Sequence, residues 1–207
     1  MCIGWSFQLT LGSPNTHLNR ELLRNLKPAN YGNHGCESFA SYLPRAQTLV
    51  PHFPDSVAEQ WLHRHYNDVV SQYGWLGFED LRFTLDGWTV ERILREVRSF
   101  EGQDYDSIKH WVRWFRDPKY ATDDWLVQSM TSAGTWPQPI ITVRNPTDLA
   151  LPNGLPLGKP FHLVEGHHRL GFLMAMADDC PDKLLARHDL WIIETRAESI
   201  SSEWPNL

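Results

Sequence analysis

Apolar residues recur at helical spacing through the first part of the chain. Leu18, Leu22 and Leu26 are four residues apart, which places them on one face of a helix. Thr16 is a suitable N-cap for this helix, and the helix cannot continue through Pro28. The pattern therefore predicts that the chain begins with a helix that has one buried face.

More helices are predicted further along the chain. A second helical pattern begins at Asp55 or Ser56 and ends at Gly74, which is expected to adopt the left-handed conformation of a helix end. Two further amphipathic helices are predicted between Thr89 and Pro118, because apolar residues there recur at the i, i+3, i+4, i+7 spacing of a core-facing stripe. These elements indicate several helices that pack against a common core.

The last third of the chain alternates short apolar strands with helices. In order, the pattern predicts a capped helix TDDWLVQSMTSAG, a strand IITV, a strand FHLV, a helix that begins near His167 and a strand DLWIIE. This succession is typical of a sheet covered by helices. We therefore expect an α+β fold with an α/β-type core, in which a small mixed sheet with packed helices (residues 79–207) follows a mainly helical N-terminal region (residues 1–78).

Composition limits the kind of protein that this chain can be. Of its 207 residues, 42% are hydrophobic, which is enough to bury a sizeable core. The formal net charge of -6 disfavours non-specific coating of duplex DNA, since such binding depends on neutralising phosphates. Three cysteines without a CxxC pair indicate a reducing compartment, and no apolar stretch reaches the length of a membrane span. We expect a cytoplasmic protein that has no membrane partner.

The sequence VEGHHRLGFL carries the most specific chemistry of the chain. It places Gly166, His167, His168 and Arg169 directly after the strand FHLV, where the next helix begins. The first turn of a helix has free N–H groups and the positive end of the helix dipole, so it favours an anion such as phosphate. The guanidinium of Arg169, expected to be exposed, adds a charged donor, and the imidazoles titrate near neutral pH. A phosphate-binding site is therefore predicted here.

Two blocks of sequence resemble the ParB/sulfiredoxin-like superfamily and its ParB N-terminal-like domain. DWLVQSMTSAGTWPQPIITV is similar to the helix, glycine turn and Pro-Ile strand of that superfamily, and FHLVEGHHRLGFL is similar to its strand and Gly-x-[His/Arg]-Arg helix start. In outline the resemblance covers residues 81–194. It implies a small α/β fold in which this helix start holds the phosphates of a nucleotide.

The resemblance also implies roles for single residues. Gly166, His168 and Arg169 match the Gly-Cys-His-Arg of sulfiredoxins. His167 stands in place of the reactive cysteine, so reduction of a sulfinic acid is not expected. Partition-type ParB proteins carry Gly-Glu-Arg-Arg, of which only Gly166 and Arg169 are matched. Ser129 falls where sulfiredoxins place a phosphate-binding serine on the preceding helix.

Together these features lead us to expect an enzyme that binds ATP or another nucleoside triphosphate, with Mg²⁺ carried by the nucleotide. Its expected activity is that of a phosphoryl or nucleotidyl transferase or of a nucleotide hydrolase, with an acceptor that the sequence does not define. Free serine kinases of the superfamily use a carboxylate as general base, which makes Glu165, Asp123 and Asp124 candidates. We take Glu165 and His167 as the candidate catalytic residues. The candidate nucleotide-binding residues are Gly166, His168, Arg169 and Ser129.

The alternative is a non-catalytic module that senses a nucleotide or associates with DNA. Basic residues recur beside tryptophans on two predicted helices, an arrangement that can hold single-stranded nucleic acid. They alternate with Glu91, Glu96 and Glu101, as on a solvated helix face, so a nucleic-acid partner is not favoured. A protein-ligated metal is not expected, since neither HExxH nor the Cys/His spacing of a zinc site occurs. The basic residues are Arg92, Arg95, Arg98, Lys109, Arg113 and Arg116.

Overall fold

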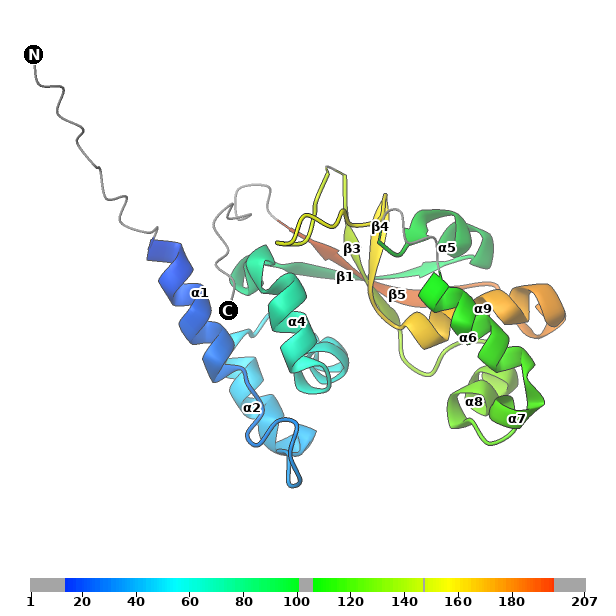
Figure 1. The fold of residues 1–207 in the computed structure, drawn as a ribbon, viewed down its shortest axis with the longest axis horizontal. Coiled ribbons are helices and arrows are strands. Elements are labelled where there is room, and N and C mark those ends of the chain that lie inside the picture. The colour runs from blue at the N-terminus through cyan, green and yellow to red at the C-terminus, as the bar shows by residue number, and fades with distance from the viewer. Residues whose placement is uncertain (1–13, 101–105, 147, 196–207) are drawn as a thin grey trace, which may run out of the picture.

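A mixed β-sheet with helices on both faces forms the centre of the protein (Figure 1). The computed structural model describes residues 14–100, 106–146 and 148–195, and within these residues the sheet has five strands in the order β1-β5-β3-β4-β2. The α+β fold with a small mixed sheet, predicted from the sequence, is thus confirmed. The strands are β1 Arg82–Trp88, β2 Val97–Arg98, β3 Ile140–Arg144, β4 Phe161–Glu165 and β5 His188–Glu194.

The central strands are buried on both faces. Strand β5 pairs with β1 in the antiparallel and with β3 in the parallel direction, while β4 pairs antiparallel with β3 and parallel with β2. Side chains of consecutive residues point to opposite faces. Ile140 and Leu163 accordingly pack in one hydrophobic layer, and Ile141 and Val164 in the other. Because helices cover both layers, β3 and β4 read as apolar runs.

The helices that precede β1 cover one face of the sheet (Figure 1). Leu26 and Trp61 share a hydrophobic cluster with Val143 and Ile193 of the sheet. The N-terminal region therefore has one core in common with this face of the sheet. Its elements are α1 Pro14–Asn25, α2 Phe39–Leu49, α3 Asp55–Val57, the π-helix η1 Ala58–His63, α4 Tyr66–Tyr73 and the 3₁₀ helices η2 Gly74–Leu76 and η3 Phe78–Asp80.

The single helix predicted from residue 55 to Gly74 is interrupted. The chain adopts a π-helix after α3, where the N–H of Arg64 donates to the carbonyl of Glu59, five residues back (3.2 Å). The expected left-handed conformation of Gly74 is wrong, because the chain continues there in a right-handed turn with φ of −58°. Gly77, three positions later, has the left-handed conformation (φ 72°).

Three other local features differ from the sequence prediction. Helix α1 begins at Pro14, so Thr16 lies within it rather than capping it; proline is favoured at a first helical position, where no N–H is needed. Helix α2 was not predicted, and it contains an internal proline, Pro44. Strand β1 was not predicted either, because it lies at the edge of the sheet and most of its residues are partly or fully exposed.

Another group of helices covers the opposite face of the sheet (Figure 1). Helix α8 is capped and ends at Gly134 (φ 69°), as predicted, and the side chains of Thr89 and Asp124 accept hydrogen bonds from the first turns of α5 and α8. No helix in the described ranges is long and apolar enough to cross a membrane. The elements of this layer are α5 Val90–Glu96, α6 Asp106–Arg116, α7 Pro118–Ala121, α8 Trp125–Ala133, α9 His167–Asp179 and the 3₁₀ helix η4 Pro181–Lys183.

Helices α6 and α9 approach each other closely at Gly171. A Cβ at this position would lie 2.5 Å from the Cβ of Trp111, a distance that atoms do not tolerate, and 3.0 Å from the carbonyl oxygen of Ile108. The absence of a side chain at Gly171 therefore brings Trp111 beside the first turn of α9.

His162 of β4 is a titratable group that is fully buried within the sheet. The N–H of Gly158 donates to its Nδ1 (3.2 Å), so the neutral ring carries its proton on Nε2, 3.0 Å from the hydroxyl oxygen of Tyr73. Burial lowers the pKa of His162 to about 4, because the charged ring would lose its hydration. His162 is therefore neutral when the protein is folded at neutral pH.

The buried state of His162 predicts that the protein loses stability on mild acidification. The unfolded chain takes up a proton near pH 6.5 and the folded chain only near pH 4, so stability falls as the pH drops through this window. Between pH 7 and pH 5 the loss from this residue is about 2 kcal/mol. Urea unfolding at both pH values is expected to show this loss in the wild type and a smaller one in His162→Gln. An equal loss in both proteins would contradict it.

Candidate functional site

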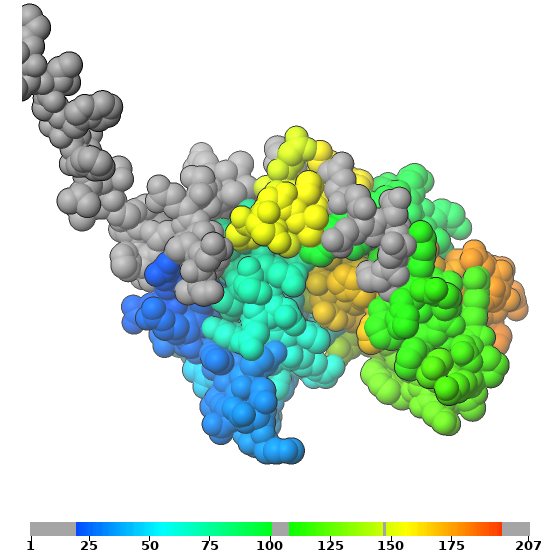
Figure 2. Space-filling view, viewed as in Figure 1, coloured from blue at the N-terminus to red at the C-terminus, as the bar shows by residue number. Residues whose placement is uncertain are grey.

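A cavity of about 430 Å³ opens at the N-terminus of α9. Figure 2 shows the surface hollowed between the cyan N-terminal helices and the green α6–α8 segment, with gold residues of the β4–α9 segment at the floor. Both helical layers thus contribute to one site. The wall residues are Gln60, Arg64, His65, Trp111, Trp125, Leu126, Pro137, Gln138, Glu165, Gly166, His167, His168 and Arg169.

The helix start itself depends on Gly166. This residue follows the last residue of β4 and has a φ of 107°, a conformation that residues with a side chain rarely adopt. A Cβ there would also lie 2.6 Å from Cγ2 of Ile140. Helix α9 begins at the next residue without a side-chain cap, so the N–H groups of its first turn are left for another acceptor at the cavity. This arrangement agrees with the strand, glycine and helix start predicted from the sequence.

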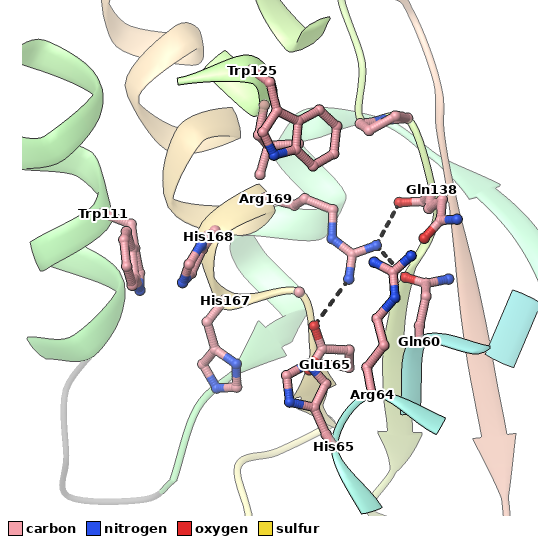
Figure 3. A pocket seen from close by; sticks show the side chains of 13 residues that line it. Gln60, Arg64, His65, Trp111, Trp125, Gln138, Glu165, His167, His168 and Arg169 are labelled. Carbon is pink, nitrogen blue, oxygen red and sulfur yellow. Dashed lines mark hydrogen bonds and ion pairs between the residues drawn. The ribbon is translucent and has the colours of Figure 1, made fainter. Parts of the chain in front are cut away.

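Arg169 is placed differently from the prediction, because its side chain is buried (the residue is 8% exposed). Its guanidinium donates to the side-chain oxygen of Gln60, to the carbonyls of Gln138 (2.8 Å) and Pro139 (3.1 Å), and to the carboxylate of Glu165 (3.2 Å), as Figure 3 shows in part. A buried charge must be paired and hydrogen-bonded in this way. The expected exposed guanidinium is therefore wrong, and Arg169 acts as a structural link.

The carboxylate of Glu165 lies between the side chains of Arg169 and His65. One carboxylate oxygen accepts from Arg169, and the other is 3.8 Å from Nε2 of His65. The side chain is partly exposed to the cavity. One oxygen thus stays available for a proton or for a ligand while the other is held in place.

The two histidines of the helix start are held in a partly desolvated environment. Burial lowers the pKa of His167, and the nearby Glu165 opposes that shift. The ring of His168 lies against the indole of Trp111, with centroids 3.3 Å apart, and desolvation lowers its pKa as well. Both rings are therefore neutral at pH 7, each with one donor and one acceptor nitrogen.

The N-terminal layer contributes residues that the sequence analysis did not assign to this site. The π-helix and the residue pair after it bring Gln60, Arg64 and His65 to the same cavity. Arg64 is 53% exposed and pairs with Glu59 (2.6 Å), so its charge remains accessible to a ligand. Gln60 is only 3% exposed, and its amide nitrogen has no hydrogen-bond partner among the described residues. No local signal could have found them, since they precede the helix start by about a hundred residues.

Helix α8 contributes through residues other than the one expected. Ser129 does not line the cavity, whereas Trp125 and Leu126 do. The two acidic candidates on this segment, Asp123 and Asp124, do not line the cavity either, and Asp124 is used as the cap of α8. In the described part of the chain, no group of three or more His, Cys, Asp or Glu side chains has the arrangement of a metal site. The cavity therefore combines one carboxylate, several nitrogen donors and two indoles.

The environment of Arg169 predicts a large effect on stability. Arg169→Ala removes a buried cation and leaves Glu165 and Gln60 unpaired, so the free energy of unfolding is expected to fall by about 3 kcal/mol or more. Arg64→Ala breaks an exposed ion pair and is expected to cost less than about 1 kcal/mol. Urea unfolding of both variants measures the difference. Equal costs for the two substitutions would contradict the structural role of Arg169.

Comparisons of this chain with protein-family models, with curated proteins and with solved structures found no match.

Proposed function

We propose that the protein binds the phosphates of a nucleoside triphosphate, most simply ATP, at the N-terminus of α9 and transfers a phosphoryl or nucleotidyl group or hydrolyses the nucleotide. The observation that carries this proposal is the uncapped start of α9, which opens into a cavity where His167, His168 and Arg64 supply further donors. Free N–H groups, neutral imidazoles and an accessible guanidinium suit the oxygen atoms of phosphate. The resemblance to the ParB/sulfiredoxin-like superfamily supports the same ligand.

The proposed binding roles follow from exposure and pairing. Gly166 lets the ligand approach the backbone, His168 donates from its place beside Trp111, and Arg64 takes the cationic role expected of Arg169. The amide nitrogen of Gln60 provides one more donor that is not used within the described residues. Arg169 supports these groups by fixing Glu165 and Gln60.

In the proposed reaction Glu165 is the general base. Its carboxylate accepts the proton of an acceptor hydroxyl or of water as that oxygen forms a bond to phosphorus, and the bond from phosphorus to the leaving oxygen breaks. His167, next to Glu165, would donate a hydrogen bond to the developing charge. Mg²⁺ bound to the nucleotide would neutralise the leaving phosphates. Glu165 is the single carboxylate that lines the cavity, so the metal would arrive with the nucleotide and be held by its phosphates and by water while Glu165 acts as the base.

A non-catalytic nucleotide sensor is the second candidate. It is favoured by the position of Glu165, whose carboxylate lies between Arg169 and His65 and so has a structural function already. Nucleic acid as the partner receives less support, since three of the basic residues of α5 and α6, Arg92, Arg95 and Arg116, form ion pairs. Arg92 pairs with Glu96, and Arg116 with Asp178 and Asp179.

Nucleotide binding predicts a thermal shift. ATP with Mg²⁺ at 100 times its Kd should raise the free energy of unfolding by about 2.7 kcal/mol, which corresponds to a shift in Tm of roughly 5 °C or more. Arg64→Ala is expected to weaken binding about tenfold, because a charge-assisted hydrogen bond is lost. Arg113→Ala, which removes an exposed arginine outside this cavity, is the matched control and should bind as the wild type. No shift with any nucleotide would refute the proposal.

If Glu165 is the general base, replacing it should lower the rate of turnover without weakening the binding of the nucleotide. Glu165→Gln keeps a hydrogen-bond acceptor for Arg169 but removes a negative charge beside the phosphates, so affinity should be equal or tighter. Turnover, followed as nucleotide consumed or acceptor modified, should fall by about 100-fold. Wild-type protein that binds nucleotide but consumes none, with or without acceptors, would favour the sensor.

A further inference from the structure

Trp125 is a large aromatic side chain left exposed at the wall of the cavity. The residue is 67% exposed, whereas Trp61, Trp88 and Trp136 are buried in the two hydrophobic layers. It lines the same cavity as the helix start of α9. An exposed indole in a cavity wall offers a flat surface on which another ring can stack.

The backbone that carries Trp125 is firmly held. Asp124, the residue before it, accepts hydrogen bonds from the N–H of Leu126 (2.8 Å) and from the indole N–H of Trp114 (3.1 Å). Trp125 therefore occupies the first position of α8 on a fixed support. Leu126 and Pro137 line the cavity as well, so this end of it is apolar.

The cavity thus has two chemically different ends. In Figure 3 the indole of Trp125 lies at the opposite end of the drawn group from His65 and Glu165, with the start of α9 between them. A ligand that reaches from Trp125 to the start of α9 joins an aromatic ring to an anion. The volume of about 430 Å³ lies in the range of sites for small organic ligands.

We infer that Trp125 stacks on the base of a purine nucleotide whose phosphates lie at the start of α9. This inference rests on the proposed function and adds the base-binding subsite to it. Stacking increases with the overlap of the two rings, so a purine gains more than a pyrimidine on the same indole. Stacking also tolerates either purine, so ATP and GTP should bind more tightly than CTP and UTP.

The test compares a nucleotide with the same anion lacking a base. Isothermal titration calorimetry gives the Kd of ATP and of inorganic triphosphate, each with Mg²⁺, for the wild type, Trp125→Leu and Trp125→Phe. Trp125→Leu should weaken ATP binding about tenfold or more and leave triphosphate binding unchanged. Trp125→Phe, which retains a ring, should restore most of the affinity for ATP. Leu85→Ala, which shortens an exposed apolar side chain of β1 outside the cavity, is the control and should change neither Kd.

The outcomes separate this inference from the proposed function. If wild-type protein binds ATP and triphosphate equally tightly, or if Trp125→Leu weakens both to the same extent, the base subsite is overturned while the phosphate site stands. Binding of CTP as tight as that of ATP would overturn the purine preference. If the wild type binds neither ATP nor triphosphate, the proposed function and the inference both fail.

Discussion

The buried guanidinium of Arg169 joins the parts of the protein that meet at the cavity. It binds Gln60 from the N-terminal layer, the carbonyls of Gln138 and Pro139 before β3, and Glu165 at the end of β4. A buried cation with fewer partners would be strongly unfavourable, so these contacts fix one another. Arg169, which the sequence suggested as a phosphate ligand, therefore supports the cavity through its contacts with other residues. The accessible cation is Arg64, which belongs to another part of the chain.

Much of the fold could be predicted because its signals are local. Thr89, Asp124 and Gly134 mark helix ends through contacts within a few residues, and the order of strand, Gly166 and helix was readable for the same reason. The position of the cavity followed from this helix start. Strand β1 was not predicted, because it lies at the edge of the sheet and its sequence has no run of apolar residues. The ParB/sulfiredoxin-like resemblance remains a hypothesis that rests on two sequence blocks.

The composition of the site was less predictable, since it depends on contacts between distant segments. Whether Arg169 is exposed depends on Gln60, which lies 109 residues earlier in the chain. Ser129 was placed by analogy, whereas the structure turns Trp125 and Leu126 of the same helix toward the cavity. Tertiary packing selects which side chains of a helix reach a site, and spacing along the sequence alone does not determine it.

The π-helix η1 has a consequence for how this site tolerates changes in chain length. A π-helical turn holds one residue more than an α-helical turn between its hydrogen-bonded groups. Because this turn already accommodates one extra residue, deleting one residue from 58–63 would tighten it to an α-helical turn with little rotation of Arg64 and His65 about the helix axis. A deletion from a regular α-helix such as α9 would instead rotate the side chains on one side by roughly 100° relative to those on the other. The segment that brings Gln60, Arg64 and His65 to the cavity is therefore better able to lose a residue than the helix start that faces it.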